Sequence, residues 1–307
     1  MKRNIFLGIF IIGSLTFADQ ALAQGTAIGI SPVTFELTGN PGDVIVNQIK
    51  VYNPSEETKV GIKMEAEDIR TEGEGGQVVA EPKELETFSL RRWITIEPKE
   101  FVLGPKQQEF VTFTIAIPKN AEPGGHYGAV LASTKSVAGP GFTGAAISQR
   151  VGTVILLSVA GEVEEDLEVV GFSAPQYSEY GPITFEIKFK NQGTIHVKPK
   201  GGITISDWLG RKLAEVSFPE KNVLPGAIRK IQTSWNTKWL LLGRYTATLH
   251  GSYGISNTPF KSQVITFWGF SWKIGIGILA IVIFFFLTRR RWIAALKILI
   301  KGEEIKK

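Results

Sequence analysis

Apolar and polar residues alternate at every second position through most of residues 28–265, and this pattern constrains the fold more than any other feature. The clearest runs are residues 60–66, 111–117 and 185–189. A period of two places alternate side chains on opposite faces of a β-strand. Gly- and Pro-containing turns separate the runs, and no helical stripe of a dozen residues occurs before residue 267. Many short strands divided by turns predict an all-β chain built from sandwiches.

Three sequence landmarks occur twice, in the same order, in the two halves of this region. The paired copies are residues 49–53 and 187–191, 102–105 and 223–226, and 125–129 and 243–247. We therefore expect two tandem immunoglobulin-like β-sandwiches, of the chaperone or fibronectin kind, over residues 24–161 and 162–266. A solvated acidic connector is expected at residues 162–168.

The third landmark has the pattern Gly-basic-Tyr-x-Ala in both halves. In immunoglobulin-like sandwiches, a Tyr near the start of the penultimate strand buries its ring while its hydroxyl bonds backbone at the corner. A preceding Gly permits a tight connection. The predicted corner residues are Gly125, Tyr127, Gly243 and Tyr245. His126 and Arg244 alternate with the tyrosines and are expected to be exposed.

The N-terminal residues 1–23 have the pattern of a secretory signal peptide. Lys2 and Arg3 precede the apolar run 5–12, and residues 21–23 supply a small-x-small cleavage site. Gln24 is then the first residue of the mature protein. This pattern predicts export.

An apolar stretch near the C-terminus predicts a single transmembrane helix over residues 267–288, long enough for a bilayer core of about 30 Å. Aromatic residues at its start suit the headgroup level, where Lys273 extends its amine outward. The stop-transfer residues are Arg289, Arg290 and Arg291, and residues 289–307 form a basic tail. The positive-inside bias then predicts a single-pass protein of the bacterial cytoplasmic membrane, with its sandwiches outside and its tail in the cytoplasm.

Charge and cysteine content exclude several classes of function. Residues 289–307 carry a net charge of +5, equal to that of the whole chain. The basic charge therefore lies in the tail beside anionic lipid, and no folded basic surface for nucleic acid is expected. The chain has no cysteine, which excludes disulfides, thiolate metal sites and a catalytic thiol.

Residues 30–131 resemble the N-terminal domain of the WxL-interacting proteins of Gram-positive surfaces. The resemblance lies in residues 30–33, 41–42, 49–55, 93–98, 101–103, 115–119 and 123–127. It implies display in the cell envelope, peptidoglycan binding by the first domain, and association with secreted WxL-domain surface proteins. The second domain resembles the host-ligand domain of that family only in position and all-β character.

No catalytic motif stands out in the chain. The three histidines, His126, His196 and His250, lack metalloprotease spacing, and neither a Gly-x-Ser-x-Gly elbow nor a phosphate loop occurs. We expect no enzymatic activity and no cofactor.

Two charged segments are expected to be solvated. Acidic residues cluster at 65–74 ahead of Gly75 and Gly76, but their order matches no EF-hand, so no metal site is expected. Lys198 and Lys200 are expected on a solvated edge that discourages pairing between sheets.

Arg91, Arg92 and Trp93 are the most suggestive binding residues of the first domain. Guanidinium groups can bind carboxylates of a cell-wall polymer, and an indole can stack on sugar. The structural alternative makes Trp93 part of the strand framework. Trp208, Trp235 and Trp239 are expected in the core or at the rim of the second sandwich.

The sequence leaves two functions open. The first is a membrane-anchored protein that binds a cell-wall polymer, such as peptidoglycan, or surface proteins. The second is a membrane-tethered, chaperone-like assembly factor that lends or receives a strand. An unpaired strand edge would favour the second, whereas a cleft that holds a histidine beside a carboxylate would favour an envelope hydrolase.

Overall fold

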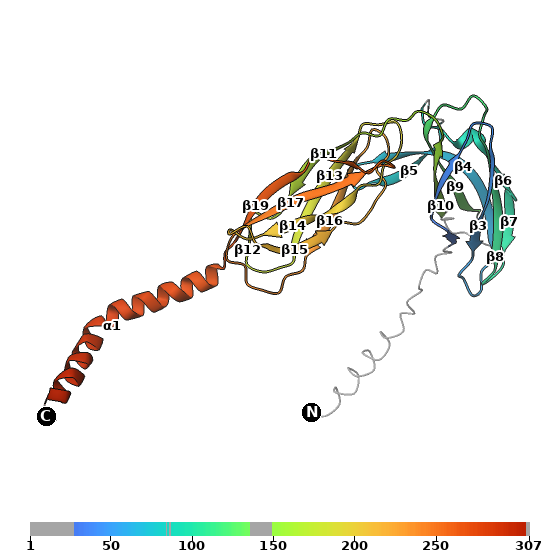
Figure 1. Ribbon diagram of the computed structural model, residues 1–307. Coiled ribbons are helices and arrows are strands. Elements are labelled where there is room, and N and C mark those ends of the chain that lie inside the picture. Colours follow the sequence, from blue (N-terminus) through green and yellow to red (C-terminus); the bar gives the residue numbers. More distant parts are fainter. Residues whose placement is uncertain (1–27, 84, 86, 136–148, 305–307) are drawn as a thin grey trace, which may run out of the picture.

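The computed structural model describes residues 28–83, 85, 87–135 and 149–304. It contains two β-rich bodies, and a long helix leaves the second body at the end farthest from the first (Figure 1). The predicted signal peptide, residues 1–23, lies outside the described residues. The all-β prediction is confirmed at the level of β-sandwich sheets, with α1 and the short η2 as the helical elements among the described residues.

The first sandwich consists of two sheets. In order across the first sheet, the strands are β1 (Gly29–Ser31), β3 (Val44–Tyr52), β8 (Gln108–Ala116) and β6 (Ile94–Glu97). The second sheet contains β2 (Thr34–Gly39), β10 (Arg150–Val159), β9 (Gly124–Lys135), β4 (Val60–Glu72) and β5 (Gln77–Glu81), and β7 (Glu100–Leu103) also pairs with β4. β2 and β10 are parallel, whereas the other pairs within these two sheets are antiparallel.

The second sandwich repeats this arrangement with shorter connections. Its first sheet contains β11 (Leu167–Ser173), β13 (Ile183–Asn191) and β16 (Ile228–Trp235). Its second sheet contains β12 (Tyr177–Ser178), β19 (Gln263–Gly269), β17 (Gly243–Tyr253), β14 (Lys200–Ser206) and β15 (Lys212–Ser217), with β18 (Thr258–Pro259) paired to β17.

The alternation in the sequence separates core from surface in both sandwiches. In β8, Val111, Phe113 and Ile115 are fully buried, and the residues between them are more exposed. β13 shows the same pattern, with Phe185 and Phe189 fully buried. Burial of such side chains contributes about 2 kcal/mol each, which makes these faces the main source of stability in a chain without disulfides.

The first pair of repeated landmarks has the same local geometry. Asn53 directly follows β3, Asn191 is the last residue of β13, and both are buried. The Asn53 side chain donates to Thr58 O at 2.7 Å and to Gly104 O at 3.0 Å, and it accepts from Ser55 N. Each amide therefore closes the turn after its strand and joins it to the next landmark.

The Asn191 side chain makes the equivalent contacts in the second sandwich. It donates to Ile195 O and to Val223 O, each at 2.8 Å, and it accepts from Gly193 N at 2.9 Å. Buried polar groups with all partners present stabilise one backbone arrangement. The repeat in the sequence thus corresponds to a repeated hydrogen-bond pattern.

In the connector between the sandwiches, residues 162–168, the side chains of Glu162, Glu164 and Glu168 are exposed, and the backbone is bonded to the second sandwich. Ala160 N donates to Gly39 O of the first sandwich at 2.9 Å. Glu164 N donates to Thr194 Oγ1, and Thr194 N donates back to Glu164 O at 2.9 Å. A Cβ at Gly193 would overlap Glu164 O, so the close approach requires glycine there.

The C-terminal helix begins later than the sequence predicts. β19 continues to Gly269, and α1 spans Trp272–Glu304. Phe267, expected at the headgroup level, is instead fully buried in the core, where its ring stacks on Tyr245. Arg289, Arg290 and Arg291 lie within α1. Among the residues described, none of the helices has the length and apolar character needed to cross a membrane, so the predicted span is unsupported.

Candidate functional site

A buried carboxylate holds the segment that contains the predicted binding residues. Asp68 on β4 is fully buried and accepts hydrogen bonds from Ser89 Oγ and from three backbone amides, those of Leu85, Leu90 and Arg91, at 2.8 to 3.1 Å. These bonds anchor the short 3-10 helix η2 (Arg91–Trp93) beside β4. The acidic segment is therefore only partly solvated, contrary to expectation.

The predicted trio of Arg91, Arg92 and Trp93 does not form one binding face. Arg91 donates from Nη1 to Pro82 O at 2.5 Å and lines a groove, and Arg92 is exposed. Trp93 packs against the core, with its ring centroid 4.3 Å from that of His126. The indole is therefore absent from the groove lining and cannot stack on a sugar there.

His126 is buried rather than exposed. Its Nδ1 lies 3.2 Å from Ser89 O, and its Nε2 lies 3.0 Å from Glu122 O. The alternation that predicted exposure fails here because η2 and its preceding loop cover this face of β9. His126 supports the loop that carries Arg91.

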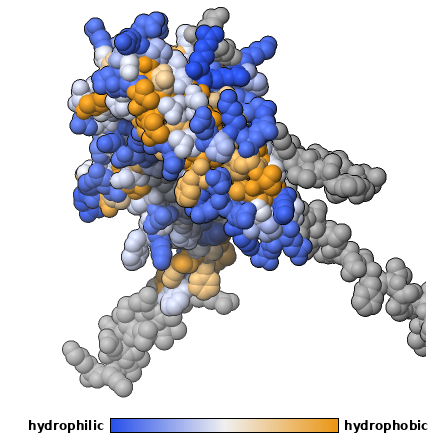
Figure 2. All heavy atoms as spheres, turned by 90° about the vertical axis from the view of Figure 1, so that its right-hand side faces the viewer, coloured by the Kyte–Doolittle hydropathy of each residue, from blue (hydrophilic) through white to orange (hydrophobic). Residues whose placement is uncertain are grey.

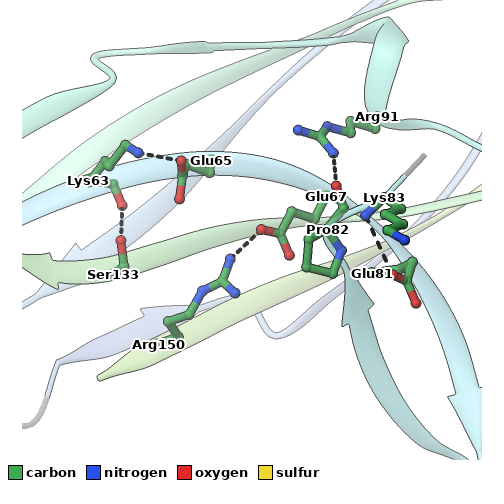
Figure 3. A network of polar contacts seen from close by, with 9 residues as sticks. All are labelled: Lys63, Glu65, Glu67, Glu81, Pro82, Lys83, Arg91, Ser133 and Arg150. Carbon is green, nitrogen blue, oxygen red and sulfur yellow. Dashed lines mark hydrogen bonds and ion pairs between the residues drawn. The ribbon is translucent and has the colours of Figure 1, made fainter. Parts of the chain in front are cut away.

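The groove that Arg91 lines lies between the two sheets of the first sandwich and has a volume of about 400 Å³. β4, β6, β7 and η2 border it. Its charged lining residues are Lys63, Glu65, Arg91, Lys99 and Glu100, with the apolar or neutral residues Met64, Ala66, Ile94, Thr95 and Ile96 between them. Lys63 and Glu65 form an ion pair at 2.5 Å (Figure 3).

On one side of the groove, β4 has a short unpaired stretch. Its pairing with β7 ends at Lys63, and its pairing with β5 begins at Asp68. Met64 N donates to Lys99 O, away from β9. Because alternate residues direct their backbone groups to opposite neighbours, those of Ala66 also face away from β9, where no described strand pairs with them.

On the other side, β6 presents a second edge. Ile117 N donates to Asp43 O on the β3 side of β8, so the backbone groups of Thr114 face β6. Thr95 is paired with Thr114, and the backbone groups of Ile96 therefore face away from β8. β8 is the one described strand that pairs with β6. The groove thus has unpaired backbone groups on both walls.

A second set of polar contacts fixes the strands beside the groove. Glu67 is buried, and its carboxylate accepts from Arg150 Nη2 of β10 at 2.6 Å (Figure 3). Ser133 Oγ donates to Lys63 O. These contacts join β4 to β9 and β10. Within the described ranges, no cluster of three or more histidine or acidic residues could hold a metal ion.

Tyr245 has the arrangement expected of a corner tyrosine. It is buried, and its hydroxyl accepts a hydrogen bond from Leu242 N at 3.2 Å. Gly243 has φ of 94°, a backbone conformation that favours glycine. Arg244 is exposed, as predicted from the alternation.

Tyr127 has a different role, which corrects the corner prediction for the first sandwich. Its hydroxyl accepts from His196 N of the second sandwich at 2.8 Å and lies 3.3 Å from His196 Nδ1. Its ring packs in an apolar cluster that Leu224 of the second sandwich joins. A Cβ at Gly125 would overlap the Tyr127 hydroxyl, and Gly125 N donates to Thr194 O at 3.0 Å. These residues form the junction between the sandwiches.

Two ion pairs reinforce this junction. Lys198 Nζ lies 2.8 Å from the Glu36 carboxylate, which also accepts from Asn222 at 2.7 Å. Lys198 is therefore paired across the junction rather than on a free edge. On the turn after β4, Glu74 pairs with Lys188 at 2.6 Å. Both contacts are partly exposed, and such pairs contribute about 1 kcal/mol or less.

The junction changes the titration of two of its side chains. The hydrogen bond from Lys198 lowers the pKa of Glu36 below its ordinary value. Burial lowers the pKa of His196. Glu36 raises this pKa to a smaller extent, and Lys198 lowers it. The two shifts favour the ionised carboxylate of Glu36 and the neutral imidazole of His196.

The tryptophans of the second sandwich divide between core and surface. Trp235 packs against the core, whereas Trp208 and Trp239 are exposed. The sequence pattern missed the roles of Asp68, Glu36 and His196. The sequence did contain one indication that Asp68 is buried, since it lies next to Ile69 in a predicted strand of alternating apolar residues.

No family model and no curated protein matches the chain. Among solved structures, the chain is similar to the class 5 fimbriae chaperone CfaA, with 15% identity, a TM-score of 0.38, and coverage of 78% of this chain and 99% of that one. It is similar to a CsuC–CsuE chaperone–tip adhesion subunit pre-assembly complex of Acinetobacter baumannii, with 10% identity, a TM-score of 0.37, and coverage of 79% and 98%.

A third similar structure is a PapD-like domain of human CEP192, with 12% identity and a TM-score of 0.32. It covers 48% of this chain and 97% of that domain. Similarity at this level assigns no role to any residue of the groove or the junction.

Proposed function

We propose that the protein is a membrane-attached, extracytoplasmic assembly factor of the bacterial cell envelope, and that it receives an extended segment of a secreted protein in the first sandwich. The pair of unpaired strand edges at Ala66 and Ile96 carries this proposal. An extended segment that adds to a sheet edge gains main-chain hydrogen bonds, and neighbouring side chains supply selectivity.

Binding of a cell-wall polymer is the alternative function. Arg91 could bind a carboxylate of such a polymer, but the Trp93 ring packs against His126 and the groove lining contains no aromatic residue. Sugar recognition commonly uses an aromatic face, so the groove favours a polypeptide. Peptidoglycan binding and association with WxL-domain proteins stay predictions.

The exposed apolar surface of α1 supports attachment to a membrane. Side chains from Ile276 to Leu287 are exposed around the helix, including three consecutive phenylalanines, Phe284, Phe285 and Phe286. Water disfavours so large an apolar surface, and contact with lipid removes it from water. The orientation predicted from the three arginines after residue 288 stays a prediction.

A photo-crosslinking experiment tests the proposed groove. A benzophenone amino acid replaces Thr95, which is exposed in the groove, in the full-length chain. The matched control carries the same group at Val46, an exposed residue of β3 outside the groove. We expect a secreted envelope protein to crosslink at position 95 and not at position 46. Crosslinking to glycan alone, or equal products at both positions, would contradict the proposal.

Amide hydrogen exchange then tests strand addition itself. A synthetic peptide with the sequence of the crosslinked segment is added to the full-length protein. We expect slower exchange of the Ile96 and Ala66 amides, because both become hydrogen-bonded, and no change at the paired amide of Thr95. Unchanged exchange at Ile96 and Ala66 in the presence of bound peptide would rule out strand addition.

A further inference from the structure

The end of the second sandwich next to α1 carries a concentration of exposed aromatic side chains. Every exposed aromatic residue that the structure describes between residues 162 and 272 lies there. The set, which we name the aromatic platform, consists of Tyr177, Tyr180, Trp208, Trp239, Trp268, Phe270 and Trp272, together with Leu209 and Leu242. Trp239 is 82% exposed and Trp208 is 64% exposed. So many large apolar side chains on one end mark an interaction surface.

Backbone contacts bring the segments of the platform together. Leu241 N donates to Glu179 O at 3.0 Å, and Phe270 N donates to Ser178 O at 3.1 Å. A Cβ at Gly243 would lie 3.6 Å from Trp208 Cδ1. The segments 177–180, 208–209, 239–242 and 268–272 therefore occupy one end of the sandwich, the end from which α1 leaves (Figure 1).

The surface elsewhere is different. Figure 2, which looks toward the first sandwich, shows small hydrophobic patches separated by hydrophilic residues. In the second sandwich, the exposed apolar residues outside the platform are isolated and aliphatic, namely Val170, Leu213, Ile255 and Val264. Isolated exposed aliphatic residues are common on folded proteins, whereas a cluster of indoles and phenols is not.

The composition of the platform fits the headgroup region of a phospholipid bilayer. Tryptophan and tyrosine have an apolar body and a polar tip, and they concentrate at membrane–water interfaces. Lys238, in the loop before β17, and Arg244, in β17 opposite Trp268, are exposed and pair with no described acidic residue, so they can attract anionic headgroups. The apolar exposed stretch of α1 begins directly after the platform, at Ile276.

We propose that the aromatic platform rests in the headgroup layer of a phospholipid bilayer and holds the second sandwich against the membrane surface. This proposal rests on the membrane attachment proposed above and adds a second contact, made by loops of the sandwich rather than by α1. It does not involve the groove, so failure of strand addition at the groove would leave this proposal intact.

Site-directed spin labelling tests the proposal in the full-length protein. The chain has no native cysteine, so single cysteines can be labelled without further changes. The test variants are Trp239→Cys and Leu209→Cys, and the matched control is Ile255→Cys, which is 85% exposed in the same sandwich but outside the platform. Each labelled protein is reconstituted into vesicles of phosphatidylethanolamine and phosphatidylglycerol.

The measurement is the ratio of label collisions with oxygen to collisions with a water-soluble nickel chelate, because oxygen concentrates in lipid. We expect this ratio at positions 239 and 209 to exceed the ratio at position 255 by at least about two-fold. Equal ratios at all three positions would overturn the proposal. Exclusion of both reagents from position 239 would show contact with protein instead and would also overturn it.

Discussion

The two sandwiches use the same asparagine in the same way and the same tyrosine in different ways. Asn53 and Asn191 make matching sets of contacts with the turn that follows each strand. Tyr245 bonds backbone within its own sandwich, whereas Tyr127 bonds His196 across the junction.

The difference shows which part of a repeated motif fixes which property. The Gly-basic-Tyr-x-Ala pattern places both tyrosines at corresponding positions of β9 and β17, each next to the last strand of its sandwich. The partner of the hydroxyl depends on which backbone amide is near, and that amide belongs to another domain in one case. A motif therefore predicts strand position better than it predicts a hydrogen-bond partner.

Substitution of the two asparagines should have the largest effect on stability, and it tests whether both sandwiches use this residue in the same way. Asn53→Ala and Asn191→Ala should each lower the free energy of unfolding of their own sandwich by about 2–3 kcal/mol, because several buried backbone groups lose their partner. Urea denaturation followed by hydrogen exchange resolved by domain measures this loss. Asn236→Ala, at an exposed position, is the control and should have little effect. A loss of stability in only one sandwich would show that the two asparagines are not equivalent.

Substitutions of the two tyrosines should differ in their effects, whereas those of the two asparagines should have the same effect. Tyr245→Phe leaves Leu242 N without its partner and should destabilise the second sandwich by about 1 kcal/mol. Tyr127→Phe should leave each sandwich equally stable but increase amide exchange at His196, because the lost bond crosses the junction. Domain-resolved exchange measures both effects. Equal destabilisation of the first sandwich by Tyr127→Phe would restore the corner interpretation.

Acidification should give the smallest effect and should act on the junction. Burial lowers the pKa of His196 from 6.5, so the unfolded or separated state binds the proton more readily. The contact is therefore fully stabilised above about pH 6.5 and weakens as pH falls through the lowered pKa, by less than about 1 kcal/mol.

Glu36 should add a second loss at lower pH. Lys198 lowers its pKa from 4.5, so its contribution is present above that value and is lost as pH falls through the lowered pKa. Small-angle scattering against pH measures the separation of the sandwiches, with His196→Asn as the control for the first step. A pH dependence that is the same in the unmodified protein and in His196→Asn would contradict the role of His196.

Local patterns predict the strands and the repeated turns well. The alternation in residues 111–117 and 185–189 corresponds to β8 and β13, since one face of each strand lies in a core. The paired asparagines stand at the same position of the repeated landmark, at the ends of residues 49–53 and 187–191, so the repeat is visible in the sequence. These features depend on residues close together in the chain.

The candidate site depends on residues far apart, which local patterns do not contain. Asp68 is buried because the segment containing Ser89 and Leu90 returns across β4, and its acidic neighbours in the sequence suggest solvent instead. Trp93 and His126 meet only after β9 and η2 pack together. The unpaired stretch around Ala66 is a property of sheet pairing, since it exists because β5 and β7 both stop short of it.

Hydrogen bonds from His196 N to the Tyr127 hydroxyl and from Gly125 N to Thr194 O join the two sandwiches directly at the junction. While these bonds hold, the junction has a fixed reach, so cargo bound in the proposed groove would stand at a constant distance from the start of α1. Mechanical force applied to that cargo would pass to α1 without first extending a slack linker.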